Sequence, residues 1–281
     1  MIRPDLHLHS SASDGIYDAD ELARLVQKAN VTLFSVTDHD TVAALPRASQ
    51  AAYDRGLAFI PGVEISKEND SHVHILGYGV KADDGELTSF LDQMAEQRKD
   101  RVLQMGRALY DLGMPIPFEE IVYTAEASVG RPHLGRAMVE MGYVGSVQEA
   151  FDRFLGSGRP AYVPRQTPTA SQAIAFLRSR GAVPVLAHPS EIKLPIESFL
   201  PLLRQWMDAG LQGLEVYHPS NRGSYDKWLR IARENRLLVT GGSDFHDPSP
   251  GHGQIGETAA EWHDALEDGW KLFRAVKNQS I

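Results

Sequence analysis

DADELARLVQKANVTLFSVTDHD, from Asp18 to Asp40, is the stretch that decides the fold. Leu22 and the apolar residues three and four positions after it form one stripe, which predicts an amphipathic helix over Asp18 to Asn30. Leu33 to Thr37 is a short apolar run that is typical of a buried strand, and polar residues follow it directly. A helix that leads into a buried strand is the repeating unit of parallel sheets covered by helices.

The same alternation of helix and strand continues beyond this stretch. A second amphipathic helix is predicted over Ile196 to Ala209. The order of these elements predicts an α/β fold with a mainly parallel sheet, closed or nearly closed into a barrel. The further predicted strands are Leu57 to Ile65, Val73 to Tyr78, Val183 to Ala187, Gly213 to Tyr217 and Leu237 to Thr240.

The alternation stops between about Gly79 and Pro164, where the pattern is helical throughout. Apolar residues at helical spacing predict one long helix over roughly Glu86 to Leu112. Pro117 and Pro132 suit the first turns of shorter helices, and Gly156 to Pro164 is predicted to be the return linker. We therefore expect a barrel domain made of residues 1–80 and 165–281, and an inserted all-helical, substrate-binding cap made of residues 81–164.

The composition limits the chemistry. The 281 residues include no cysteine, so disulfides, thiolate metal sites and a cysteine nucleophile are excluded, and any metal must bind His and carboxylates. The net charge of −9 disfavours binding to phosphate backbones and anionic membranes, so neither a membrane nor a stable nucleic-acid complex is an expected partner. No apolar run approaches the ~18 residues of a membrane span, and the N-terminus has no apolar signal region. These features predict a cytoplasmic enzyme.

Histidines and carboxylates gather at the predicted strand ends. His7 and His9 lie two residues apart at the end of the first strand, so both project to the same face. Asp244 and His246 repeat this spacing after the last strand. A single histidine in such a place is more often a hydrogen-bonded structural residue than a metal ligand. The whole set, however, would meet on one rim of a barrel and predicts a metal site; its other members are His39 and Glu64, which end the second and third strands, His74, which starts the fourth, and His188, which ends the fifth.

Taken together, these motifs resemble the PHP (polymerase and histidinol phosphatase) family of metal-dependent phosphoesterases. They follow the family's order over nearly the whole chain. The resemblance implies a distorted seven-stranded (β/α) barrel, the PHP fold, with three metal ions. The segments that carry it are His7-Leu8-His9-Ser10, Ser13-Asp14-Gly15, Thr37-Asp38-His39, Gly62-Val63-Glu64, His74, Ala187-His188-Pro189 and Ser243-Asp244-Phe245-His246.

The resemblance also implies which residues hold each ion. Imidazole and carboxylate ligands suit Mn²⁺, which we expect first, and Fe²⁺ or Zn²⁺ as alternatives. Water shared between two such ions loses a proton near neutral pH and becomes a hydroxide nucleophile that would attack phosphorus. The implied sets are His7, His9, Glu64 and Asp244 for one ion, Glu64, His74 and His188 for a second, and Asp14, His39 and His246 for a third.

Three further residues are candidates for acid–base catalysis. Asp38 and Asp40 flank the implied ligand His39 and could orient it or transfer protons, although capping of their loop is an equal alternative. His218 ends a predicted strand and could act as a general acid toward the phosphate ester.

The insertion adds a phosphate-binding signal. Arg131 and His133, in Gly130-Arg131-Pro132-His133, lie at the predicted start of a helix, where the helix dipole and a guanidinium group both favour phosphate. The motif is weak by itself, but it resembles the arginine-and-histidine turn of PHP enzymes that hydrolyse nucleoside 3′,5′-bisphosphates and trim RNA 5′ ends. We therefore expect a phosphomonoesterase that removes the 3′-phosphate of such a nucleotide, or trims short RNA. A histidinol-phosphate phosphatase and a non-catalytic metal-binding PHP module are the alternatives.

Overall fold

The computed structural model describes residues 2–67, 73–124, 129–164, 168–249, 253–259, 262, 268 and 271–272. The chain divides into two compact units. The barrel unit comprises the described residues of Met1–Lys67, Ser71–Thr88 and Pro168–Ile281, and the helical unit those of Ser89–Thr167. No helix in the described ranges is both long and apolar enough to span a bilayer.

The barrel unit is built on a seven-stranded sheet whose strands neighbour one another in sequence order. All neighbouring pairs are parallel except β3–β4 and β4–β5, so β4 alone runs the opposite way. The reversal has a simple cause, because β4 begins soon after β3 ends and a parallel pair needs a crossover of about a dozen residues. The strands are β1 (Pro4–Asp5), β2 (Leu33–Val36), β3 (Ala58–Lys67), β4 (Val73–Tyr78), β5 (Val183–Leu186), β6 (Gly213–Tyr217) and β7 (Leu238–Gly241).

Backbone contacts between the two ends of the sheet nearly close it. The Leu6 amide donates to the carbonyl of Gly241 at 3.1 Å, and the Asp244 amide donates to the carbonyl of His7 at 2.9 Å. Leu8 and Phe245 form an isolated parallel β-bridge. The predicted distorted (β/α) barrel is therefore confirmed, with β4 as the reversed strand.

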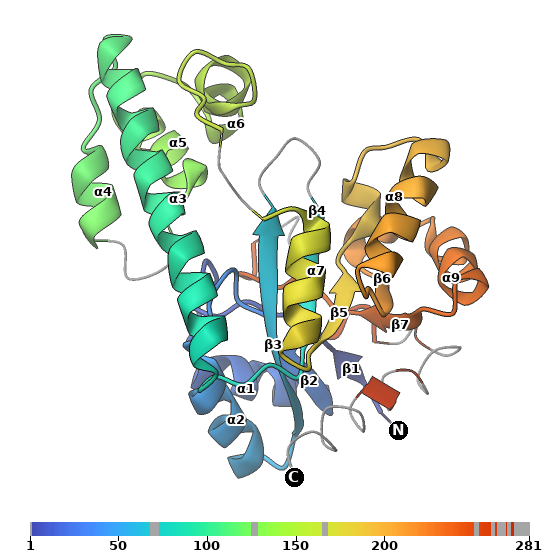
Figure 1. Cartoon of the computed structure of the whole chain (residues 1–281). Coiled ribbons are helices and arrows are strands. Elements are labelled where there is room, and N and C mark those ends of the chain that lie inside the picture. The colour runs from blue at the N-terminus through green and yellow to red at the C-terminus, as the bar shows by residue number, and fades with distance from the viewer. Residues whose placement is uncertain are drawn as a thin grey trace. The chain divides into compact units, whose positions relative to one another are not determined.

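Helices cover the outside of this sheet (Figure 1). α1 begins because the Asp18 carboxylate accepts the amide of Glu21, and it buries Leu22 and Val26. α2 packs on β3, α7 on β4 and β5, and α9 on β6 and β7. The covering helices are α1 (Ala19–Lys28), α2 (Leu45–Asp54), α7 (Ala170–Ser179), α8 (Ile196–Asp208) and α9 (Tyr225–Glu234), with short 3₁₀ turns η2 (Pro189–Glu191) and η3 (Pro219–Asn221) between strands and helices.

The helical unit has its own core and lies in the chain between β4 and β5. Met105, Leu134 and Met138 are fully buried in that core. The segment predicted as a linker, Gly156 to Pro164, is instead packed, because Ala161 is buried in the same core and the Val163 carbonyl accepts the Nε–H of Arg101 at 2.7 Å. The helices are α3 (Gly85–Asp111), whose first turn belongs to the barrel unit, α4 (Phe118–Thr124), α5 (Arg131–Glu140), α6 (Val147–Ala150) and the π-helical turn η1 (Phe151–Leu155).

Candidate metal centre

The ends of the strands and the loops after them carry the polar side chains of the centre. β1 already ends at Asp5, so His7 and His9 lie just beyond it, not at its end as predicted. The prediction that Glu64 ends the third strand is also wrong, because β3 continues to Lys67 through its pairing with β4. Glu64 nevertheless stays at the rim, since its backbone forms a β-bridge with His39.

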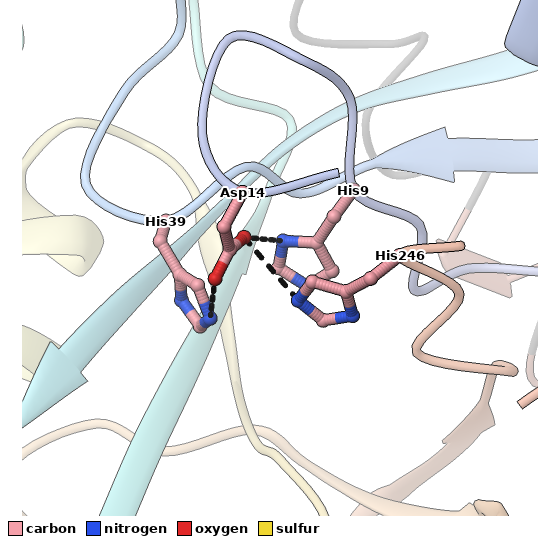
Figure 2. A group of neighbouring side chains, drawn as sticks. All are labelled: His9, Asp14, His39 and His246. Atoms are coloured by element: carbon pink, nitrogen blue, oxygen red, sulfur yellow. Dashed lines mark ion pairs between the residues drawn. The ribbon is translucent and has the colours of Figure 1, made fainter. Parts of the chain in front are cut away.

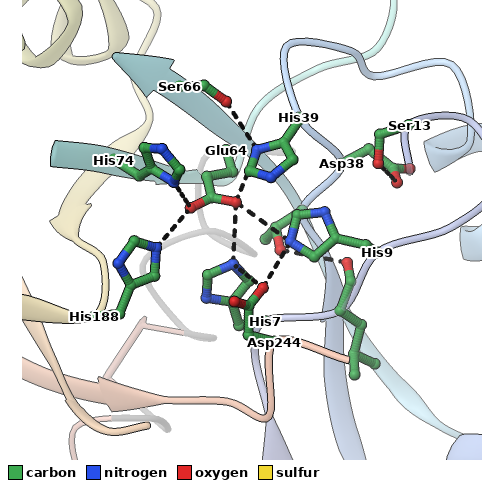
Figure 3. A network of polar contacts seen from close by, with 12 residues as sticks. His7, His9, Ser13, Asp38, His39, Glu64, Ser66, His74, His188 and Asp244 are labelled. Carbon is green, nitrogen blue, oxygen red and sulfur yellow. Dashed lines mark hydrogen bonds and ion pairs between the residues drawn. The ribbon is translucent and has the colours of Figure 1, made fainter. Parts of the chain in front are cut away.

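Glu64 is the hub of the cluster (Figure 3). Its side chain is buried, and imidazole rings from five separate positions face its two oxygens. Oε2 lies 3.2 Å from His7 Nε2, 3.3 Å from His9 Nε2 and 3.0 Å from His39 Nδ1, and Oε1 lies 2.9 Å from His74 Nδ1 and 3.1 Å from His188 Nε2.

Two further carboxylates complete the cluster. Asp244 Oδ1 lies 3.2 Å from His7 Nε2 and 3.1 Å from His9 Nε2. Asp14 is the more exposed carboxylate and faces His9, His39 and His246 at 3.7, 3.8 and 3.2 Å (Figure 2). Residues of the first loop, the second loop and the loop after β7 therefore meet around one point.

Four groups within the described residues are close enough to share an ion, with ligand atoms within 4.8 Å of one another. One group coincides with the first implied ligand set. A second contains the third implied set together with His9. A third has His39 where the resemblance implies His188, although His188 also contacts Glu64. The groups are His7, His9, Glu64 and Asp244; His9, Asp14, His39 and His246; His39, Glu64 and His74; and His7, Glu215 and His218.

The buried groups shift one another's pKa values in opposite directions. Burial lowers the pKa of His9, but the carboxylates of Asp244 and Glu64 outweigh it and raise the pKa to about 10. Burial raises the pKa of Glu64, but the surrounding imidazoles, first His39 and then His7, hold it well below its usual range. At His39 burial prevails over the carboxylates and lowers the pKa to about 4. Opposed shifts of this kind among neighbours are frequent at functional sites.

The donor set fits divalent metal ions better than a network of hydrogen bonds alone. A carboxylate offers about four lone-pair sites, two on each oxygen, whereas three imidazole nitrogens face Oε2 of Glu64 alone. Both ring nitrogens of His9 are buried without a hydrogen bond of good geometry. Imidazoles and carboxylates without thiolates are ligands that Mn²⁺, Fe²⁺ and Zn²⁺ accept. The residues present therefore fit the ions that the resemblance implies.

Comparison with known proteins places the chain in a family. A model of the PHP domain matches residues 5–113. The chain is 31% identical to the 3′,5′-nucleoside bisphosphate phosphatase of Chromobacterium violaceum, over 92% of each chain. The chain belongs to the PHP family. It is also 33% identical to the 5′-3′ exoribonuclease Rnm of Escherichia coli, over 98% of this chain and 94% of the relative.

A solved structure with a similar fold supports the reaction class. A protein from Bifidobacterium adolescentis assigned as a metal-dependent phosphoesterase superposes with a TM-score of 0.76 at 27% identity, covering 94% of this chain and 96% of its own. The predicted reaction class, hydrolysis of phosphoric esters, is confirmed by these relatives. The predicted dependence on metal is confirmed for the family, and the clusters around Glu64 are able to hold ions.

Two aspartates of this PHP chain hold loops in place. The Asp38 carboxylate is buried and accepts the Ser10 amide at 2.7 Å, the Ser10 hydroxyl at 2.6 Å and the Ser13 hydroxyl at 2.7 Å. Asp40 accepts the amide of Ser66 at 3.0 Å. These contacts favour the capping interpretation over proton transfer, because both carboxylates are used to fix the loops that carry Asp14 and His39.

His218 lies at the centre, and the two phosphate-binding candidates lie together in the helical unit. His218 is buried, and its Nε2 faces Asp244 Oδ2 at 3.5 Å. Arg131 is the first residue of α5, and its guanidinium carbon lies 5.3 Å from the centroid of the Phe151 ring. His133 Nδ1 accepts the amide of Gly130 at 3.1 Å, so this ring caps its own helix.

Sequence reasoning missed two buried acids beside the centre. Glu215 contacts His7 from the middle of β6. Asp5 accepts the amides of Ser243 and Gly256 at 2.9 and 2.7 Å. The available signal was an acid inside or directly beside an apolar run, since such residues are almost never fully buried without a partner.

Proposed function

We propose that this PHP protein is a metal-dependent phosphomonoesterase that removes the 3′-phosphate of nucleoside 3′,5′-bisphosphates and also trims short RNA from its 5′ end. The observation that carries the proposal is the hub at the buried Glu64, around which five imidazoles and Asp244 gather. The named activities of the two curated relatives support both substrate classes. A cytoplasmic location stays a prediction.

Three ions, with Mn²⁺ as the first expectation, would be held by the predicted ligands. We assign His7, His9, Glu64 and Asp244 to one ion, Glu64, His74 and His188 to a second, and Asp14, His39 and His246 to a third. Bound divalent ions supply positive charge for the phosphate oxygens and lower the pKa of water. The protein's own contribution is to fix these side chains, which it does through the buried contacts around Glu64.

His218 is proposed as the general acid. Its Nδ1 accepts the amide of Ser220 at 3.1 Å, so a neutral ring carries its proton on Nε2. Nε2 is also the atom that faces Asp244 and hence the centre. His218 can therefore hold a proton where a phosphate ester would be cleaved.

Arg131 and His133 are proposed to hold the phosphate that does not react. A 3′,5′-bisphosphate carries a second phosphate that must be bound outside the metal cluster. The guanidinium of Arg131 stands at the first position of α5, where the helix dipole favours anions. Because Nδ1 of His133 already accepts the Gly130 amide, a neutral ring offers Nε2–H as a second donor. This assigns substrate binding to the helical unit.

A histidinol-phosphate phosphatase is the second candidate, because the same centre would serve it. Arg131 at the start of α5 favours the bisphosphate, since histidinol phosphate has no second phosphate for a guanidinium to bind. A non-catalytic metal-binding module is the third candidate, and it predicts metal binding without turnover.

Release of phosphate from the small substrates and of nucleotides from RNA separates these candidates. The protein is stripped of metal, reloaded with Mn²⁺ and given a nucleoside 3′,5′-bisphosphate, the matching 5′-monophosphate, a short 5′-phosphorylated RNA and histidinol phosphate. We expect the highest kcat/KM for the bisphosphate. Preference for histidinol phosphate, or no turnover of any substrate by metal-loaded protein, would contradict the proposal.

A further inference from the structure

Glu215 lies in the middle of β6, and its side chain is fully buried beside the centre. One oxygen, Oε1, lies 3.0 Å from Nδ1 of His7. The other, Oε2, accepts the backbone N–H of His188 at 2.8 Å. One carboxylate thus contacts a ring nitrogen of one proposed ligand and the backbone of another.

Both ring nitrogens of His7 have carboxylate neighbours. Its Nε2 faces Glu64 and Asp244, each at 3.2 Å, and belongs to the group that could hold the first ion. An imidazole can offer Nε2 to a cation only when the ring proton is on Nδ1. Nδ1–H then needs an acceptor, and an ionised carboxylate is an acceptor only. Glu215 Oε1 therefore selects the tautomer that leaves Nε2 free for an ion.

The second contact of Glu215 supports an unusual backbone. His188 has φ of 22° and ψ of 64°, a conformation in the left-handed region that side chains other than glycine rarely adopt. The hydrogen bond from its N–H to Oε2 stabilises this conformation and helps to point Nε2 at Glu64 Oε1, 3.1 Å away. The orientations of His7 and His188 are thereby linked through a single side chain.

The backbone of Glu215 is itself held by a side chain. Asn221, which is buried in η3, donates from Nδ2 to the carbonyls of Glu215 and Val216 at 2.9 and 3.0 Å. Its Oδ1 accepts the amide of Ser190 in η2 at 3.1 Å. The backbone of Glu215 is thus tied to the turn that follows His188.

We propose that Glu215 is a positioning residue that sets the tautomer of His7 and couples the first ion position to the one held by His188. The inference rests on the proposed metal centre. Glu215 also belongs to a group with His7 and His218 that could share an ion. That use is disfavoured, because His7 Nδ1 is at hydrogen-bond distance from Oε1 and His218 Nδ1 accepts the amide of Ser220.

The decisive variant is Glu215→Gln, which keeps the shape and removes the second acceptor. The amide oxygen can still accept from His188, but the amide nitrogen then donates to His7 Nδ1 and drives the ring proton onto Nε2. Changes in residues that orient metal ligands typically cost about 10–100-fold in affinity. We expect calorimetric titration of metal-free protein with Mn²⁺ to show a loss of this size. Affinity equal to that of the wild type in a folded variant would overturn the proposal.

Asp268→Asn is the matched control. Asp268 is also a buried carboxylate that accepts one backbone amide, that of Val239 at 3.3 Å, and it contacts the basic side chains of Arg233 and Lys271. The substitution Asp268→Asn removes a buried charge that does not contact a proposed metal ligand. We expect Mn²⁺ affinity to be unchanged in this variant. A loss of affinity equal to that of Glu215→Gln would show that removing any buried charge weakens metal binding, and it would contradict a specific role of Glu215.

A spectroscopic experiment tests the tautomer of His7 directly in the wild-type protein. Long-range ¹H–¹⁵N spectra of the Zn²⁺-loaded protein report which ring nitrogen of His7 is protonated, and we expect Nδ1. Protonation at Nε2 overturns the inference even if Glu215→Gln does not fold. Absence of any divalent-metal binding by the wild type would instead refute the proposed function itself, so the two failures are distinct.

Discussion

The metal centre and the start of α5 are both polar sites, but they are built differently. At the centre, Glu64 is contacted by imidazoles from positions far apart in the chain. At α5, Arg131 and His133 are two residues apart, and their contacts include the ring of Phe151 and the amide of Gly130. Contacts from many parts of the chain fix the geometry of the metal centre, so it is the same for every substrate. The start of α5 depends on a few local contacts, so it can affect the binding of one substrate and not that of another.

Removing the metal should have the largest effect, because every substrate depends on the centre. We expect chelation to abolish hydrolysis of both the bisphosphate and a simple ester such as p-nitrophenyl phosphate, and Mn²⁺ to restore both. Phosphate release before and after dialysis against chelator measures this. Full activity in protein shown to be metal-free by elemental analysis would remove the centre from the reaction.

Asp244→Asn should have the next largest effect. The substitution keeps the side-chain volume, and Asn tolerates the left-handed backbone that Asp244 adopts, with φ of 53°. It weakens a contact shared by His7 and His9. We expect turnover of both substrates to fall by at least ~10²-fold, as for other changes in metal ligation, while the variant still folds. Near-native turnover with bound metal would show that Asp244 is not a ligand.

Arg131→Ala should separate the two regions most clearly. Losing the guanidinium that holds the non-reacting phosphate should lower kcat/KM for the bisphosphate by about 2–4 kcal/mol, the range for removing one partner of a buried charge pair. Hydrolysis of p-nitrophenyl phosphate should barely change. Equal losses on both substrates would place Arg131 at the reacting phosphate, and no loss on either would limit it to packing against Phe151 and Tyr162.

His133→Ala should have the smallest effect of the four changes, and this effect should be a loss of stability at the start of α5. It removes the acceptor for the Gly130 amide at the start of α5, and the loss of such a cap costs about 1 kcal/mol. Hydrogen exchange of the α5 amides measures the loss. Gln172→Ala is the matched control, because Gln172 accepts the Thr169 amide in the same way at the start of α7. A loss of bisphosphate activity beyond this structural cost would support the proposed contact of His133 with phosphate.

The sequence was sufficient for the alternation of elements and for the set of polar residues at the rim. Residues two apart in extended chain project to the same side, so the His7/His9 pair could be predicted to converge with Asp244 although β1 ends at Asp5. The extension of β3 past Glu64 could not be predicted from the sequence, because it comes from pairing with β4. Nor could the hydrogen bonds of Asp38, since its partners Ser10 and Ser13 depend on how the first loop folds back. Glu215 escaped attention because one acid in an apolar run has no periodic signature.

The bridge between Leu8 and Phe245 has a consequence for the order in which the protein can mature. His7 and His9 precede Glu64 and His74 in the chain, and the last two can meet on the local antiparallel pair β3–β4. Asp244 and His246 are synthesised after all the other proposed ligands. A nascent chain therefore carries histidines with only part of their carboxylate partners, and the centre can be completed only when β7 has docked. Metal bound after that moment would hold the loops after β1 and β7 together, so its retention would report that the two ends of the sheet have met.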